Sequence, residues 1–175
     1  MADLPRVVYL YLLSYVFPLN LLRYIFFFTT LALGPLGVFY FLKLLVFLKK
    51  EPFLRSTASF LGAYFYLFNL GTLQHFYVPF EMFASLYAFL PWLALLIANY
   101  LVEGSYKKLI LFSLVSLVAT PLAYAATLWY VYFLVVLLYI LGFNLFCSLK
   151  KGGIRRRSAI IIITTVFINS YWLLP

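Results

Sequence analysis

KKLILFSLVSLVATPLAYAATLWYVYFLVVLLYILGFNLFCSLKK, residues 107–151, is an apolar stretch with a pair of lysines at each end. A helix needs about 20 apolar residues to cross the hydrocarbon core of a bilayer, and this stretch has roughly twice that length. Both of its ends are basic, and basic loops tend to remain on the cytoplasmic side of a membrane protein. We therefore predict a hairpin of two helices that leaves this side and returns to it.

The same pattern recurs along the chain, because basic clusters separate apolar stretches of similar length. After Arg6, the clusters are Lys49, Lys50 and Arg55; Lys107 and Lys108; and Lys150, Lys151, Arg155, Arg156 and Arg157. We expect the N-terminus and these basic loops on the cytoplasmic side, and the C-terminus outside. Basic loops beside a membrane also attract anionic lipid headgroups, by about 1 kcal/mol per residue.

The composition predicts one membrane domain over residues 1–175, with no soluble domain. The chain is 67% hydrophobic and has a mean hydropathy of +1.07, whereas soluble domains are about half apolar. Its acids are Asp3, Glu51, Glu81 and Glu103. The net charge of +9 comes from residues at the ends of apolar segments, so we interpret it as a topology signal and expect no nucleic-acid partner. The predicted location is an integral membrane one: the cell membrane if the organism is prokaryotic, with organellar and endomembrane locations as alternatives.

The predicted fold class is all-α, a polytopic membrane bundle of six or seven helices arranged as hairpins. The first hairpin can be divided in three ways. Helices at Val7–Leu22 and Tyr24–Leu48 would be joined by a turn near Asn20 to Arg23, which is the division we favour. Alternatively, one long helix turns at Gly34-Pro35 and returns over Leu36–Leu48. In the third division Val7–Leu22 lies along the membrane interface, which leaves six crossing helices.

The remaining helices follow from the other apolar stretches. We place them at Thr57–Phe76, Phe80–Val102, Leu109–Tyr124, Leu128–Leu149 and Ala159–Leu174. Small residues at four-residue spacing allow helix backbones to approach closely. They predict a packing seam between the second and third of these helices, formed by Ala84, Ala88, Ala94, Ala98, Ser116, Ala119, Thr120 and Ala123.

A small polar group near the turn of the second hairpin is the candidate binding or proton-transfer site. His75 is the sole histidine, and Glu81 follows six residues later. A histidine and a carboxylate can relay protons, and Asn69 and Gln74 would add amides to an outward cavity. An ordinary interfacial turn is the alternative interpretation. One histidine and one carboxylate are too few for a typical metal site, so no metal is predicted.

The sequence contains no motif of a known catalytic centre. It has no HExxH, no CxxC and no glycine-rich phosphate loop, and Cys147 is its single cysteine. We predict no catalytic residues and no cofactor. The 20 Phe, 16 Tyr and 3 Trp suit lipid contact or helix packing, with a quinone pocket as the alternative.

The function expected from these features is that of a non-catalytic accessory subunit of a larger membrane complex, respiratory or otherwise energy-transducing. Its expected partners are the lipid bilayer and other hydrophobic membrane subunits. The alternative is a small stand-alone transporter or substrate-binding module, in which Asn69, Gln74, His75 and Glu81 line the site.

Overall fold

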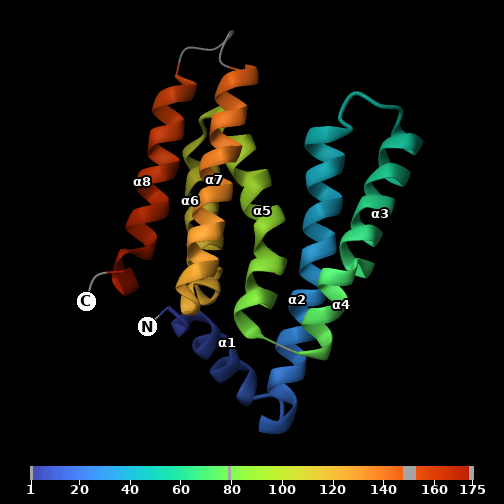
Figure 1. The fold of residues 1–175 in the computed structure, drawn as a ribbon, viewed down its shortest axis with the longest axis vertical. Helices are drawn as coiled ribbons and strands as arrows, with labels where there is room; N and C mark the ends of the chain where they lie inside the picture. Colours follow the sequence, from blue (N-terminus) through green and yellow to red (C-terminus); the bar gives the residue numbers. More distant parts are fainter. Residues whose placement is uncertain (1, 79, 148–152, 174–175) are drawn as a thin grey trace.

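The computed structural model describes residues 2–78, 80–147 and 153–173, and within them the chain is helical, with long antiparallel segments side by side (Figure 1). The elements, in chain order, are α1 (Leu4–Ser14), α2 (Leu19–Phe41), the π-helical turn η1 (Leu42–Val46), α3 (Pro52–Phe68), α4 (Leu70–Tyr77), α5 (Glu81–Glu103), α6 (Tyr106–Val118), the 3-10 turn η2 (Thr120–Tyr124), α7 (Ala126–Cys147) and α8 (Ile154–Leu173).

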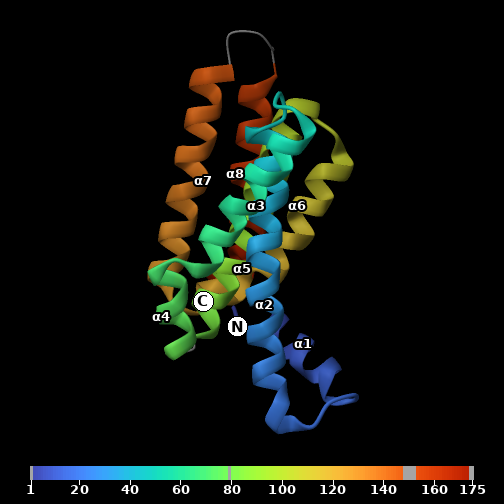
Figure 2. The ribbon, with the colours of Figure 1, turned by 90° about the vertical axis from the view of Figure 1, so that its right-hand side faces the viewer.

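Helix α5 is the central element of the structure. It packs against α2 on one side and against α6, η2, α7 and α8 on the other. In α5, 56% of the most apolar 18-residue segment is buried, compared with 22% of the corresponding segments in Leu19–Val46 and in α7. The core forms around Leu93, Ile97 and Leu101 of α5, which meet Phe112 of α6 and Ile161 of α8. Helices α2, α3 and α4 form an arm beside this bundle (Figures 1 and 2).

Among the described residues, three helices are long and apolar enough to cross a membrane: Leu19–Val46, Glu81–Glu103 and Ala126–Leu145. This is consistent with a membrane protein, but a bundle of six or seven spans is not confirmed. The other long segments depart from the pattern for local reasons. Breaks follow α3 and α6 at Asn69 and Ala119, and α8 carries three arginines in its first turn.

The first hairpin differs from the predicted division. Helix α1 has 11 residues, about 16 Å at 1.5 Å per residue, which is too short to cross a core of about 30 Å. The turn falls at residues 15–18, before the favoured position at Asn20 to Arg23, because Pro18 supplies an extended N-cap for α2. Gly34-Pro35 lies inside α2, so the division that turns there is wrong.

The N-terminus also differs from its predicted place. The backbone carbonyl of Ala2 accepts hydrogen bonds from Thr120 Oγ1 at 3.1 Å and from the Tyr171 hydroxyl at 3.3 Å. It therefore lies at the same end of the bundle as the end of α8, whereas the connections from η1 to α3 and from α5 to α6 lie at the opposite end (Figure 1). The N-terminus and these connections therefore lie at opposite ends of the bundle, because α1 does not traverse it; their predicted membrane side stays a prediction.

The contact between α2 and α5 depends on two glycines of α2. Gly34 and Gly37 are buried, and a Cβ added to them would lie 2.5 Å from a ring carbon of Tyr87 and 2.7 Å from Trp92 Nε1, respectively. The indole of Trp92 donates to the carbonyl of Leu33 at 3.0 Å. Small residues thus let two aromatic rings of α5 rest directly on the backbone of α2.

Gly34→Ala is expected to destabilise the protein by about 1–3 kcal/mol, because the new methyl overlaps a packed ring. Gly142→Ala is the matched control, since a Cβ there meets nothing within 4 Å and alanine favours a helix interior over glycine by about 0.5–1 kcal/mol. Thermal unfolding in detergent, followed by circular dichroism, should show a lower midpoint for the first variant alone. Equal midpoints would contradict the close contact.

Candidate functional site

An ionic cluster joins α1, α2 and α5 at the end of the bundle that contains the N-terminus. Asp3 is the N-cap residue of α1, and Arg6 lies one turn later on the same helix face. Arg6 Nε donates to Asp3 Oδ1 at 2.8 Å, and its Nη2 pairs with Asp3 Oδ2. Glu81, the first residue of α5, accepts at Oε1 from Arg23 Nε at 2.9 Å, with Arg6 Nη1 at 3.4 Å from the same oxygen.

The cluster is partly shielded from solvent, and its charges balance. The side chains of Asp3, Arg6 and Glu81 are 22–26% exposed, whereas that of Arg23 is 61% exposed. The hydrogen bond with Asp3 raises the pKa of Arg6, so this guanidinium stays charged. Glu81 also lies at the positive end of the α5 dipole. The two acids and two arginines therefore tie three helices together by charge.

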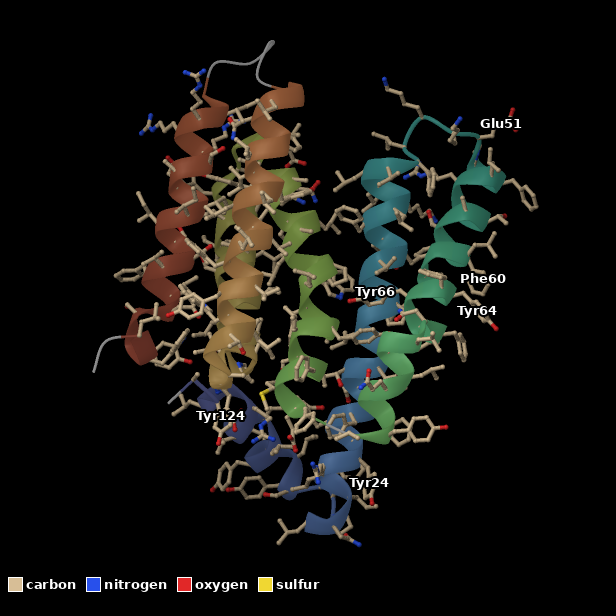
Figure 3. The ribbon with its side chains drawn as sticks, in the orientation of Figure 1. Tyr24, Glu51, Phe60, Tyr64, Tyr66 and Tyr124 are labelled. Carbon is tan, nitrogen blue, oxygen red and sulfur yellow. The ribbon has the colours of Figure 1, made fainter. Side chains whose placement is uncertain are left out.

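Two cavities adjoin this cluster, and Arg6 and Pro121 line both of them. The polar cavity, of about 230 Å³, is also lined by Asp3, Glu81, Met82 and Tyr124, and Tyr124 lies beside α1 (Figure 3). The apolar cavity, of about 250 Å³, lies between α1, α2, α5 and α6. Its other lining residues are Pro5, Tyr9, Phe26, Thr29, Thr30, Leu33, Ser85, Phe89 and Val118.

A third cavity is a largely apolar cleft of about 320 Å³ between the arm and the main bundle. Val38 and Phe41 of α2 face Val135 and Tyr139 of α7 across it, with α5 as its floor. The rings of Phe41 and Tyr139 are 6.5 Å apart. The cleft therefore resembles a pocket for an apolar group more than a site for polar chemistry.

The predicted site residues have separate places in the structure. Asn69 is the N-cap of α4: its Oδ1 accepts from the Thr72 N–H at 3.1 Å, and its Nδ2 donates to the Tyr66 carbonyl at 2.8 Å. Gln74 is exposed. His75 belongs to α4, but its side chain lies outside the described part of the structure. No contact described there joins Glu81 to Asn69 or Gln74, because Glu81 faces the two arginines.

The small residues predicted to form a seam belong to α5, α6, η2 and the Ala119 position between the last two, and α5 packs against both α6 and η2. Ala94 lines the apolar cleft instead. The buried members of the set are Ala84, Ala88 and Ala98 on α5, and Ser116, Ala119, Thr120 and Ala123 on α6 and the turn that follows it.

Two arginines of the basic loops bind the ends of helices. Arg157 Nη1 donates to the carbonyls of Leu101 and Val102 at 2.8 and 2.9 Å, which satisfies acceptors that the end of α5 leaves free. Its guanidinium lies against Gly104, which ends α5 with a φ of +68°. Arg55 Nε similarly donates to the Lys43 carbonyl at 2.6 Å.

The other basic-loop residues are more accessible. Lys108 is half-buried, and Lys150 and Lys151 lie outside the described residues. The exposed members are Lys49, Lys50, Lys107, Arg155 and Arg156.

The described residues contain no group of three or more His, Cys, Asp or Glu side chains that could hold a metal ion. Comparisons with protein-family models, with curated proteins and with solved structures each yield no significant match to this chain. The geometry of the chain itself therefore supplies the basis for a functional proposal.

The sequence interpretation missed the ionic cluster. The spacing of Asp3 and Arg6, three residues apart on one helix, is a readable signal for an ion pair. The pair between Arg23 and Glu81 is not readable in this way, because 58 residues separate its members. Those residues meet only when α2 and α5 pack together.

Arg157→Gln is expected to destabilise the protein by about 1–3 kcal/mol, because charge-assisted hydrogen bonds to two carbonyls are lost. Arg156→Gln removes the same charge from an exposed neighbour and should change stability by less than about 0.5 kcal/mol. The measurement is thermal unfolding of both variants in one detergent. Similar midpoints for the two variants would show that Arg157 contributes as a general charge and not as a helix cap.

Proposed function

We propose that this chain is a non-catalytic subunit of a larger membrane complex, and that it binds a partner through the outer face of α3. In this proposal six segments cross the bilayer, namely α2, α3 with α4, α5, α6 with η2, α7 and α8. Helix α1 lies at the membrane interface, where a short helix with a charged start is best accommodated. The three helices of sufficient length and apolarity support this arrangement.

The distribution of charge supports a common cytoplasmic face. The connections at residues 47–51 and 104–105 lie at one end of the bundle, where α7 also ends and α8 begins (Figure 1). Lysines and arginines flank these connections, as they flank cytoplasmic loops in other membrane proteins. The end with the ionic cluster and the C-terminus would then face outward.

The observation that carries the subunit proposal is the position of Tyr64. Phe60, Tyr64 and Phe68 form an aromatic row along α3, with ring centroids 6.4 and 4.6 Å apart. All three are more than half exposed, and Tyr64 projects away from the bundle (Figure 3). No hydrogen bond of the Tyr64 hydroxyl occurs within the described residues.

In the proposed topology this hydroxyl lies near the middle of the hydrocarbon core. Tyr64 is 12 residues from the start of α3 at Pro52, about 18 Å along the helix. Burial of a polar group without a hydrogen-bond partner costs about 1–3 kcal/mol according to typical protein data. Transfer of such a group into pure hydrocarbon gives the upper limit, which is several kcal/mol. By contrast, the neighbouring Tyr66 turns inward and donates to the Tyr87 carbonyl at 2.9 Å. The occupant proposed for the α3 face is therefore a membrane helix with a hydrogen-bond acceptor at mid-depth.

A second candidate function is the binding of an apolar small molecule by the chain alone, as in a transporter or substrate-binding module. The cleft between the arm and α7 favours it, because about 320 Å³ falls in the size range of small-molecule pockets. A helical segment 10 Å wide and 15 Å long needs about 1,200 Å³ and does not fit there. A lipid chain or a quinone would be the matching ligand.

The topology can be tested with single cysteines introduced into a Cys147→Ser background. Lys50→Cys and Ser105→Cys should both react with a membrane-impermeant maleimide from one face, and Tyr77→Cys from the other, because α3 and α4 separate residue 77 from the basic end. The measurement is labelling of intact cells compared with inverted vesicles. Labelling of Lys50→Cys and Ser105→Cys from opposite faces would contradict the proposed bundle.

The partner can be tested by extracting the tagged chain in a mild detergent and analysing it by native mass spectrometry. We expect co-purification of a membrane protein at fixed stoichiometry. Tyr64→Phe should weaken the association about threefold, since interhelical hydrogen bonds in membranes contribute about 0.6 kcal/mol on average. Tyr77→Phe, at the exposed end of the same arm, should have no effect. Recovery of the wild-type chain alone and monodisperse would refute the subunit proposal and favour the second candidate.

A further inference from the structure

We infer that the two cavities beneath α1 form one binding site for an amphiphile, namely a phospholipid with a zwitterionic phosphoethanolamine headgroup. The polar cavity would hold the headgroup, and the apolar cavity would hold the start of one acyl chain. This inference rests on the membrane location proposed above but not on a partner subunit.

The polar cavity offers both charges that such a headgroup requires. Asp3 and Glu81 present carboxylate oxygens to it, which suit the three N–H donors of a primary ammonium. Arg6 provides a guanidinium in the same wall, the group best matched to a phosphate. Its Nη1 is 3.4 Å from Glu81, longer than the 2.7–2.9 Å of a strong charge-assisted bond. This donor can therefore be shared with a ligand.

The apolar cavity is suited to a hydrocarbon chain despite its four hydroxyl groups, of which that of Tyr9 lies 3.2 Å from Thr29 Oγ1, within hydrogen-bond distance. Thr29, Thr30 and Ser85 each donate to a carbonyl of their own helix, at 2.7, 2.9 and 2.9 Å. Their hydrogen atoms are therefore used within the helices. The remaining walls are mostly aromatic and aliphatic side chains. An apolar chain gains from burial there by about 0.8 kcal/mol per methylene group.

The continuity of the site comes from Arg6 and Pro121, which line both cavities. A ligand that is polar at one end and apolar at the other could place its polar end in the polar cavity and its apolar end in the apolar cavity. Two carboxylates and one guanidinium line the polar cavity, and Arg23, 2.9 Å from Glu81, makes the cluster neutral, so it suits a headgroup of zero net charge better than a purely anionic one. A choline headgroup lacks N–H donors for Asp3 and Glu81. Among common headgroups, the primary ammonium with a phosphate fits best.

The test uses the purified full chain and three phospholipids with identical acyl chains, whose headgroups are ethanolamine, choline and glycerol. Each lipid is added at the same concentration in detergent, and the bound fraction is measured by native mass spectrometry. We expect ethanolamine lipid to remain bound at least fivefold more than either of the others. Equal retention of the three lipids, or preference for the anionic glycerol lipid, would overturn the inference.

Variants assign the preference to this site. Asp3→Asn and Glu81→Gln should reduce the ratio of bound ethanolamine lipid to bound choline lipid to nearly one, whereas Glu51→Gln, at the opposite end of the molecule (Figure 3), should leave it unchanged. Val118→Trp should lower binding without a change of charge, because Val118 is half-exposed and lines the apolar cavity. Circular dichroism identifies any variant that fails to fold, and the remaining ones decide the result. An unchanged ratio in the folded Asp3 and Glu81 variants would exclude the site.

Discussion

The close packing of α2 on α5 is the contact on which the rest of the structure depends. Helix α5 also contacts α6, η2, α7 and α8, whereas the arm reaches the main bundle chiefly through α2. In a bilayer, apolar side chains gain little by leaving lipid for protein, so helices associate through close fit and hydrogen bonds. Gly34 and Gly37 provide the fit, and the Trp92 indole provides the hydrogen bond. The arm, the apolar cleft and the outer face of α3 keep their positions largely through this contact, to which the hydrogen bond from Tyr66 of α3 to the Tyr87 carbonyl of α5 adds.

Arginines at the two ends of the molecule have different roles. At the basic end, Arg157 and Arg55 complete the hydrogen bonding of helix ends with their guanidinium groups. At the other end, Arg6 and Arg23 neutralise two of the four acids of the chain. Arginines at both ends of the molecule therefore contribute specific contacts as well as positive charge. Lys49, Lys50 and Lys107, which lack the planar fork of donors, are exposed.

Much of the helical pattern could be predicted from hydropathy, but the interruptions of the helices could not. Helix α5 lies within one residue of its predicted bounds, because a long apolar run favours one continuous helix. The stretch predicted as one helix over Thr57–Phe76 is broken at Asn69, whose side chain bonds to the backbone on both sides. The break after α6 precedes Pro121, which lacks an amide hydrogen. The ionic cluster was unpredictable as a whole, since its members are distant in sequence and their meeting depends on tertiary packing.

The hydrogen bonds of the Ala2 carbonyl impose an order on the assembly of the chain. Its donors Thr120 and Tyr171 are made 118 and 169 residues after Ala2. Until both are made, helix α1 has the Asp3–Arg6 pair as its own local partner. Complete docking of the segment around Ala2 therefore requires both η2 and α8 to be in place.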